Sequence, residues 1–266
     1  MITSPQNDRV KLARSLAAGA KARRKAGLFI LEGVRLINDA LERGQRPAFI
    51  LYDPNRIQPE ALPLARREAL LAAAPALIDG ISTAETPPGI VGVFPIAPPP
   101  PLPNPLRRVL ILDAVRDPGN LGAIARTAAA AGVEAVLLAP GCVDAYNPKA
   151  LRGGMGAHFR IPLLEMDWAH ISQACAGLSV ALAAMEGERA YDSVDWTRPW
   201  ALIIGGEAQG ASAAAERLAA LRVAIPMAAA TESLNAAAAA AVILFEAARQ
   251  RRAAQALGGY PPRNSS

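Results

Sequence analysis

Short apolar runs, separated by a turn and a stretch of small residues, organise residues 109–138. The first run, residues 109–112, ends before the turn Asp117-Pro118-Gly119-Asn120, and a helix is expected from Leu121 onward. Gly132 ends this helix, and a second apolar run follows directly at residues 133–138. Strand, helix and strand in this order predict a βαβ unit with parallel strands.

The same alternation continues to residue 252. Apolar runs at residues 178–185, 201–204 and 223–225 predict three more strands, and residues 213–221 predict a helix between the last two. A long alanine-rich stretch at residues 233–252 predicts a final helix. This half of the chain therefore has the pattern of an α/β fold, a mainly parallel sheet covered on both faces.

The first 94 residues predict a separate, smaller α/β domain. Strands are expected at residues 29–33, 48–52 and 90–94, and a helix at residues 34–43. Residues 95–105 are rich in proline, which favours an extended linker over a helix or a central strand. We expect an N-terminal domain at residues 1–94, a linker at 95–107, a C-terminal domain at 108–258 and a flexible tail at 259–266.

Composition indicates the cellular compartment of the protein. The chain has 266 residues and two cysteines, Cys142 and Cys175, which form no CxxC or metal-binding spacing. This cysteine usage favours a reducing compartment, so we expect a cytoplasmic protein. The first residues lack the charged and apolar regions of a signal peptide, and no apolar stretch reaches membrane-spanning length. We therefore expect no membrane partner.

Positive charge is concentrated at the N-terminus. The net charge of the chain is +5. The first 25 residues hold one acid and seven basic residues, which are Arg9, Lys11, Arg14, Lys21, Arg23, Arg24 and Lys25. Such a cluster binds a phosphate backbone through counterion release. The alternative is a solvated helix face or a frayed terminus.

Asn120 and Arg126 are expected at the carboxyl end of a strand, where α/β folds bind ligands. Each also has a simpler explanation, because Asn120 suits a turn or helix cap and Arg126 suits a solvated helix face. The chain has no GxGxxG after a strand, no phosphate-binding P-loop and no HExxH. Its two histidines are too few for a metal site, so we expect chemistry without a metal.

Three stretches, in order, resemble the motifs of the SpoU/TrmH family of RNA ribose 2′-O-methyltransferases, in the SPOUT superfamily. They are Asn120-x-Gly122-x-x-x-Arg126, the glycine-rich residues 202–210, and residues 223–227 followed by Ser233-Leu234-Asn235. Residues 144–152 and 156–162 also look like family sequence, and the resemblance covers about residues 108–252. Residues 29–35 resemble the substrate-binding domain, similar to ribosomal protein L30e, that many family members carry.

The resemblance implies a SPOUT fold with a trefoil knot and a homodimer that pairs through the last helix. It implies S-adenosylmethionine as the cofactor and a ribose 2′-hydroxyl of a structured RNA as the methyl acceptor. The first candidate substrate is 23S rRNA and the second is transfer RNA. Methyl transfer of this kind needs no metal, because the sulfonium is already a good leaving group and the enzyme has to align the oxygen nucleophile.

The resemblance also assigns residues to roles. The catalytic set is Asn120, Arg126, Glu207 and Asn235. The cofactor set is Gly205, Gly210, Ile225, Met227, Ser233 and Leu234, with Ser233 expected to cap the final helix. The RNA set is Arg9, Lys11, Arg23, Arg24, Lys25, Arg35 and Arg152.

Two of these roles have alternatives. Arg126 is the general base in the mechanism often given for the family. A guanidinium stays protonated, however, so we favour phosphate binding and stabilisation of the developing alkoxide. Glu207 either holds the second motif in place or lies exposed on the surface.

The chain departs from the family pattern at two places, with Ala237 and Gly154 where serines are usual. Neither replacement touches the catalytic set, so we expect an active enzyme. The main alternative is a non-catalytic RNA-binding or ribosome-associated protein with a vestigial methyltransferase domain. A base methyltransferase is a further alternative.

Overall fold

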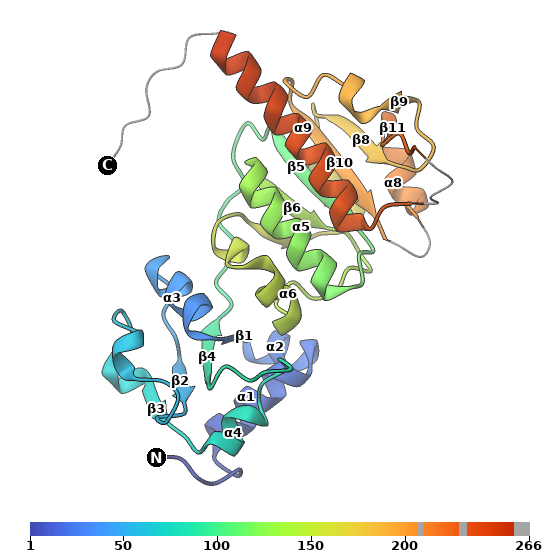
Figure 1. Cartoon of the computed structure of the whole chain (residues 1–266). Helices are drawn as coiled ribbons and strands as arrows, with labels where there is room; N and C mark the ends of the chain where they lie inside the picture. Colours follow the sequence, from blue (N-terminus) through green and yellow to red (C-terminus); the bar gives the residue numbers. More distant parts are fainter. Residues whose placement is uncertain (207–209, 229–232, 258–266) are drawn as a thin grey trace. The chain divides into compact units, whose positions relative to one another are not determined.

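The computed structural model describes residues 1–206, 210–228 and 233–257, and they form two compact units (Figure 1). The N-terminal unit consists of Met1–Pro99 together with Val143–Arg160, and the C-terminal unit of Pro100–Cys142 together with Ile161–Ser266. The chain therefore passes from one unit to the other three times. In the described part of the chain, no helix is long and apolar enough to span a membrane.

The C-terminal unit is built on a seven-stranded sheet in the order β7-β6-β5-β10-β8-β11-β9, with every neighbouring pair parallel. The strands are β5 (Arg108–Asp113), β6 (Ala135–Leu138), β7 (Leu163–Glu165), β8 (Ser179–Ala183), β9 (Arg189–Ala190), β10 (Trp200–Gly205) and β11 (Leu221–Ala224). The predicted α/β class and mainly parallel sheet are confirmed.

Helices cover both faces of this sheet. They are α5 (Pro118–Ala131), α7 (Trp168–Ala174), α8 (Ala213–Leu218) and α9 (Ala236–Leu257), with a short 3-10 helix η4 (Tyr191–Ser193). Val109, Ile111 and Ile203 point to a core shared with α7 and α8. The alternate residues, such as Leu110 and Leu202, are fully buried on the opposite face, where α5 and α9 pack together and α9 contacts β10.

Two helix boundaries differ from the sequence-based expectation. Helix α5 begins at Pro118 instead of Leu121, because the Asp117 carboxylate caps it and proline is well tolerated in the first turn. The final helix begins at Ala236, so Ser233 is not its cap. The Asn235 side chain instead accepts hydrogen bonds from the backbone N–H groups of Ala237 (2.8 Å) and Ala238 (3.4 Å), which is what an N-cap residue does.

The N-terminal unit has a four-stranded sheet in the order β1-β4-β2-β3, antiparallel except for the parallel pair β2 and β3. Its strands are β1 (Leu28–Glu32), β2 (Phe49–Tyr52), β3 (Leu70–Ala72) and β4 (Ile90–Pro95). Its helices are α1 (Asp8–Ala18), α2 (Ala20–Ala26), α3 (Val34–Glu42), α4 (Pro75–Asp79) and α6 (Pro148–Gly154), with 3-10 helices η1 (Pro59–Ala61), η2 (Arg67–Ala69) and η3 (Ala157–Phe159). A small α/β unit is present at the start of the chain, as the fold class predicts, and it also contains Val143–Arg160, which the sequence analysis places in the C-terminal domain.

Both faces of this smaller sheet are buried. Ile30 and Val93 point to a core shared with α1 and α4. Their neighbours Phe29 and Phe94 point to a second core that includes Leu151 of α6. The segment Val143–Arg160 therefore contributes a core residue to a unit formed mainly by the first hundred residues of the chain.

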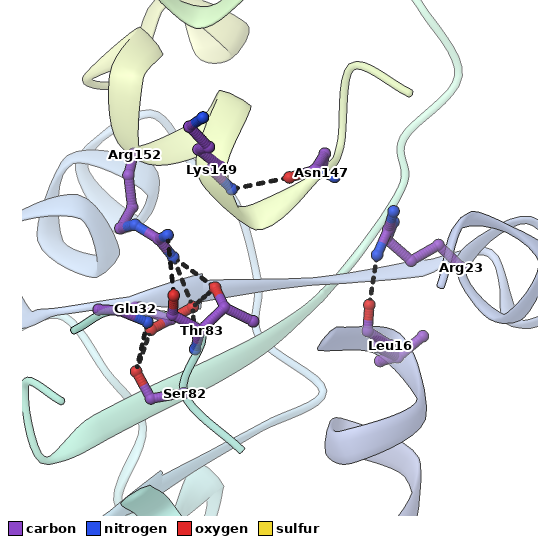
Figure 2. Close-up of polar contacts among 9 residues, drawn as sticks. Leu16, Arg23, Glu32, Ser82, Thr83, Asn147, Lys149 and Arg152 are labelled. Carbon is purple, nitrogen blue, oxygen red and sulfur yellow. Dashed lines mark hydrogen bonds and ion pairs between the residues drawn. The ribbon is translucent and has the colours of Figure 1, made fainter. Parts of the chain in front are cut away.

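Three ion pairs fix the segment Val143–Arg160 to the rest of the N-terminal unit. Arg23 Nε lies 2.7 Å from Asp144 Oδ2, with both side chains buried, and Arg23 also donates to the carbonyl of Leu16. Arg152 Nη1 lies 2.8 Å from Glu32 Oε1 and also donates to Thr83 (Figure 2). Arg160 pairs with Asp39. These contacts join the segment to α2, β1 and α3.

The trefoil knot stays a prediction. Its presence depends on the path of the chain after β10 and before α9, and residues 207–209 and 229–232 of these connections lie outside the described residues.

We expect Asp144→Asn to destabilise the N-terminal unit by about 3–5 kcal/mol, because it leaves the buried Arg23 guanidinium without a counter-charge. Glu68→Gln is the matched control, since Glu68 forms an exposed pair with Arg66 whose loss costs at most about 1 kcal/mol. Urea unfolding followed by circular dichroism measures both units. Tryptophan fluorescence reports the unfolding of the C-terminal unit alone, because all three tryptophans, Trp168, Trp196 and Trp200, belong to it. Equal stability of the two variants would contradict the expectation.

Candidate active site

The carboxyl ends of β5 and β10 lie side by side at the centre of the C-terminal sheet. In the register of this pair, Asp113 at the end of β5 is opposite Gly205 at the end of β10. Strand β6, which follows β5 in the chain, lies on the side of β5 away from β10, and β8 lies on the side of β10 away from β5. Ligands of parallel α/β sheets bind outside the strand ends at such a reversal of strand order. The first and second motifs therefore meet where a ligand site is expected.

The starts of α5 and α9 meet at this end of the sheet. Asn235 Nδ2 donates to Asn120 Oδ1 at 3.1 Å, so the third motif contacts the first. At the other end of the helices, the Arg251 guanidinium donates to the carbonyl of Ala131 at 2.9 Å. These two contacts show that the helices run parallel, as Figure 1 also shows. Both positive helix ends consequently point to the same region.

The second motif folds back on itself directly after β10. Gly206 pairs with Gly210 in an isolated antiparallel bridge, and Gly210 has a φ of 66°. A Cβ on Gly205 would lie 3.0 Å from the carbonyl carbon of Gly210, and one on Gly206 would lie 2.5 Å from the carbonyl oxygen of Ala114. The glycines are thus required by the turn itself. Glu207 lies outside the described residues.

The third motif places apolar side chains between β11 and α9. Ile225 is half-buried, while Met227 and Leu234 are among the exposed large apolar residues and Ser233 is exposed. Residues that reach the surface in this way are available to cover an apolar ligand group. They follow the carboxyl end of β11, in the same parallel sheet as β5 and β10.

Arg126 lies apart from Asn120 although both belong to α5. Their offset of six residues corresponds to about 9 Å along the axis and to different helix faces. Arg126 is exposed and makes no ion pair with any residue in the described ranges 1–206, 210–228 and 233–257. The structure therefore brings Asn120 and Asn235 together, and among the described residues the Arg126 guanidinium has no ion-pair partner.

Residues 107–245 match the SpoU rRNA Methylase family, and residues 7–92 match the MRM3-like substrate binding domain. The chain belongs to the SpoU rRNA methylase family.

Relatives of this family cover most of the chain. The chain is 34% identical over 239 residues to the 23S rRNA (guanosine(2553)-2'-O)-methyltransferase RlmP of Bacillus subtilis, across 89% of this chain and 94% of that protein. It is 33% identical over 293 residues to the mouse mitochondrial rRNA methyltransferase 3, across 88% of this chain and 70% of that protein. The solved structure of the SpoU methyltransferase AviRb from Streptomyces viridochromogenes, in complex with AdoMet, superposes with a TM-score of 0.83 at 32% identity, across 93% of this chain and 99% of that one.

The predicted RNA residues of this SpoU family member differ in their accessibility. Arg9, Lys11, Arg24, Lys25 and Arg35 are exposed on α1, α2 and α3. Arg23 is only 3% exposed and is committed to Asp144 and Leu16, so we leave it out of the proposed RNA surface. Arg152 pairs with Glu32 and Thr83, and we assign it first to holding α6 in place (Figure 2). Charge along the sequence does not distinguish a buried arginine from an exposed one.

The two departures from the SpoU pattern have different surroundings. Ala237 uses its backbone N–H to bind Asn235, a contact that a serine at this position would also make. Gly154 is buried at the end of α6 in the N-terminal unit. The sequence reasoning missed Asp113 and Ser212, which form a hydrogen bond beside the second motif. The available signal was an acidic residue placed directly after the apolar run 109–112.

Proposed function

We propose that this protein transfers a methyl group from S-adenosylmethionine to a ribose 2′-hydroxyl of a structured RNA, with 23S rRNA as the first candidate and transfer RNA as the second. The observation that carries the proposal is the contact between Asn120 and Asn235, which joins the first and third motifs beside the strand ends of β5 and β10. Relatives named as 23S rRNA 2′-O-methyltransferases support the substrate.

The residues around the strand ends fit S-adenosylmethionine. The backbone packs closely at Gly205, Gly206 and Gly210, with no side chains between it and a ligand bound at the end of the sheet. Ile225, Met227 and Leu234 offer apolar surface for an adenine ring. Solved relatives are in complex with AdoMet, which supports the same cofactor here. The cofactor supplies a methyl group on a sulfonium that needs no metal for its transfer.

Arg126 is proposed to act on the RNA and not on the cofactor. Its exposed guanidinium has no ion-pair partner in the described part of the chain, so it is free to bind a phosphate next to the target ribose. In that place it would stabilise the negative charge that develops on the 2′-oxygen during methyl transfer. Asn120 and Asn235 hold the first and third motifs together.

The N-terminal unit is proposed to bind the RNA. We propose that residues 1–94, with the segment Val143–Arg160 that belongs to the same unit, recognise the substrate. The rest of residues 108–258 is proposed to carry the chemistry, with residues 95–107 as the linker. Support comes from the substrate binding domain matched at residues 7–92 and from the exposed basic side chains on α1 and α2. Phosphate neutralisation by these side chains would contribute affinity that depends on salt.

The alternative of a vestigial methyltransferase domain makes a different prediction. A protein that only binds RNA would bind no S-adenosylmethionine and would transfer no tritium-labelled methyl group to ribosomal RNA. A base methyltransferase would still methylate an RNA with a 2′-deoxy substitution at the target nucleotide. The proposed enzyme binds the cofactor and requires the 2′-hydroxyl. The intact catalytic residues Asn120, Arg126 and Asn235 favour the enzyme.

A cytoplasmic location and a homodimer belong to the same proposal. Cys142 and Cys175 are free thiols, and burial raises the pKa of each to about 11, so both stay protonated at neutral pH. Free thiols of this kind suit the reducing cytoplasm. The homodimer is proposed to form through α9, where Phe245 is 46% exposed on an otherwise alanine-rich helix.

Arg126→Ala should lower the turnover number by about a hundredfold or more, the effect of losing one donor that stabilises transition-state charge. Its affinity for S-adenosylmethionine should stay within about threefold of the wild type, and its stability should change by at most about 0.5 kcal/mol. Arg252→Ala, which removes another exposed arginine from an alanine-rich helix, is the matched control. Methyl transfer to RNA and calorimetry with the cofactor measure the two effects. Normal turnover in Arg126→Ala would remove this residue from the proposed chemistry.

The double variant Lys11→Gln, Lys25→Gln should weaken RNA binding and reduce the slope of log affinity against log salt by about one for each lost phosphate contact. Arg66→Gln, Arg67→Gln removes the same charge from exposed positions of the same unit outside α1 and α2, and its slope should stay near the wild-type value. Filter binding across a salt series measures both. Equal slopes for the two double variants would show that α1 and α2 do not hold the RNA surface.

Phe245→Ser should convert the proposed dimer into a monomer at micromolar concentration, because it replaces the large apolar residue exposed on α9 with a polar one. Met185→Ser is the control, since Met185 is 68% exposed and precedes β9 in the same unit. Light scattering gives the mass of each. A wild-type monomer would refute the dimer, and a dimeric Phe245→Ser protein would refute the role of this surface.

A further inference from the structure

Asp113 is a buried carboxylate at the strand end that borders the second motif. It is the last residue of β5, is only 1% exposed and lies opposite Gly205 in the β5–β10 pair. Its Oδ2 accepts a hydrogen bond of 2.6 Å from the backbone N–H of Ser212. A buried carboxylate without donors is costly, so this bond stabilises the carboxylate and holds the backbone at Ser212.

Ser212 is the point at which the second motif returns to regular structure. Its hydroxyl caps α8 by accepting a hydrogen bond from the Ala215 N–H at 3.2 Å. Gly210, two residues earlier, closes the bridge with Gly206. The backbone N–H of Ser212 thus fixes the place where the motif ends and α8 begins.

Gly206, directly after β10, is also held by the end of β5. Gly206 lies against Ala114, where a Cβ would come within 2.5 Å of the Ala114 carbonyl oxygen. Ala114 has an unusual positive φ of 53°, and a Cβ on Gly141 would lie 3.2 Å from the Ala114 Cβ. The dipeptide Asp113-Ala114 therefore contacts the chain at two points after β10, through packing at Gly206 and through a hydrogen bond at Ser212.

We infer that Asp113 is a positioning residue for the cofactor, which holds the described backbone at Gly206 and from Gly210 to Ser212 in the place where it binds S-adenosylmethionine. Backbone that is held in place on the sheet before the ligand arrives does not have to be fixed during binding, so the affinity is higher. The acceptor stands on the most central strand pair of the sheet and is itself fully buried, which makes it a rigid anchor. This inference rests on the proposed function.

Asp113→Ala tests it by removing the acceptor. The dissociation constant and the KM for S-adenosylmethionine should rise on the order of tenfold, as expected for one lost hydrogen bond to a charged group. The kcat at saturating cofactor and the affinity for RNA should change little. Asp113→Asn keeps an oxygen acceptor of the same reach, and it should bind the cofactor within about threefold of the wild type. Hydrogen exchange should accelerate at the amides of Gly210 to Ala215 in Asp113→Ala and not in Asp113→Asn.

Glu134→Ala is the matched control, because the Glu134 carboxylate binds the backbone at the opposite end of β5. Its carboxylate accepts hydrogen bonds from the backbone N–H groups of Arg107 (2.7 Å) and Arg108 (3.1 Å), where β5 begins. This variant should lose stability without a change in the KM for the cofactor. A similar rise of KM in Glu134→Ala would show that general loosening of the sheet accounts for the effect.

The outcomes separate this inference from the function on which it rests. Wild-type cofactor affinity in Asp113→Ala overturns the inference while methylation by the wild-type protein still stands. Equal losses of cofactor affinity in Asp113→Ala and Asp113→Asn also overturn it. Asp113→Asn keeps the oxygen acceptor, so the hydrogen bond to Ser212 would then not explain the loss. A wild-type protein that binds no S-adenosylmethionine removes the proposed function itself.

Discussion

Parallel pairing of β5 with β10 brings together two segments that are far apart in the sequence, and the candidate site depends on it. The pair places the end of the first strand of the unit beside the turn of the second motif. Helices α5 and α9 then pack together on one face of the sheet with their positive ends at the same level. Without the register that sets Asp113 opposite Gly205, the three motifs would not form one site.

The sequence was sufficient to predict the parts of this arrangement that have strong local signals. The apolar runs correctly indicated β5, β6, β8, β10 and β11, and Gly132 correctly marked the end of α5 with its φ of 77°. The strands β7 and β9 have three and two residues, too few for any periodicity to be read. The cap of α9 was assigned to Ser233 because serine suits that role, whereas Asn235 fills it and also reaches Asn120.

The candidate site could be predicted in part for the same physical reason. Motif residues can be identified from their order along the chain, and Asn120 and Asn235 proved to lie in contact. Burial and long-range charge pairing cannot be identified in this way, since they depend on residues more than a hundred positions away. Arg23 illustrates this, because it has the same sequence surroundings as Arg24 and Lys25 but is bound to Asp144, 121 positions further on. The hydrogen bond from Ser212 to Asp113 spans 99 positions, and the local sequence marks only the acidic residue after the apolar run and not its partner.

The docking of Val143–Arg160 among the first hundred residues also bears on how such a protein can be recombined. A crossover between two related genes at the proline-rich stretch would exchange Arg23, Glu32 and Asp39 but leave behind Asp144, Arg152 and Arg160, their three partners. Each buried or half-buried charge would then depend on whether the other parent supplied a matching residue. Chimeras that carry both pieces from one parent avoid this conflict. The two stretches of the gene that encode the N-terminal unit, residues 1–99 and 143–160, therefore have to come from the same parent although they are not adjacent.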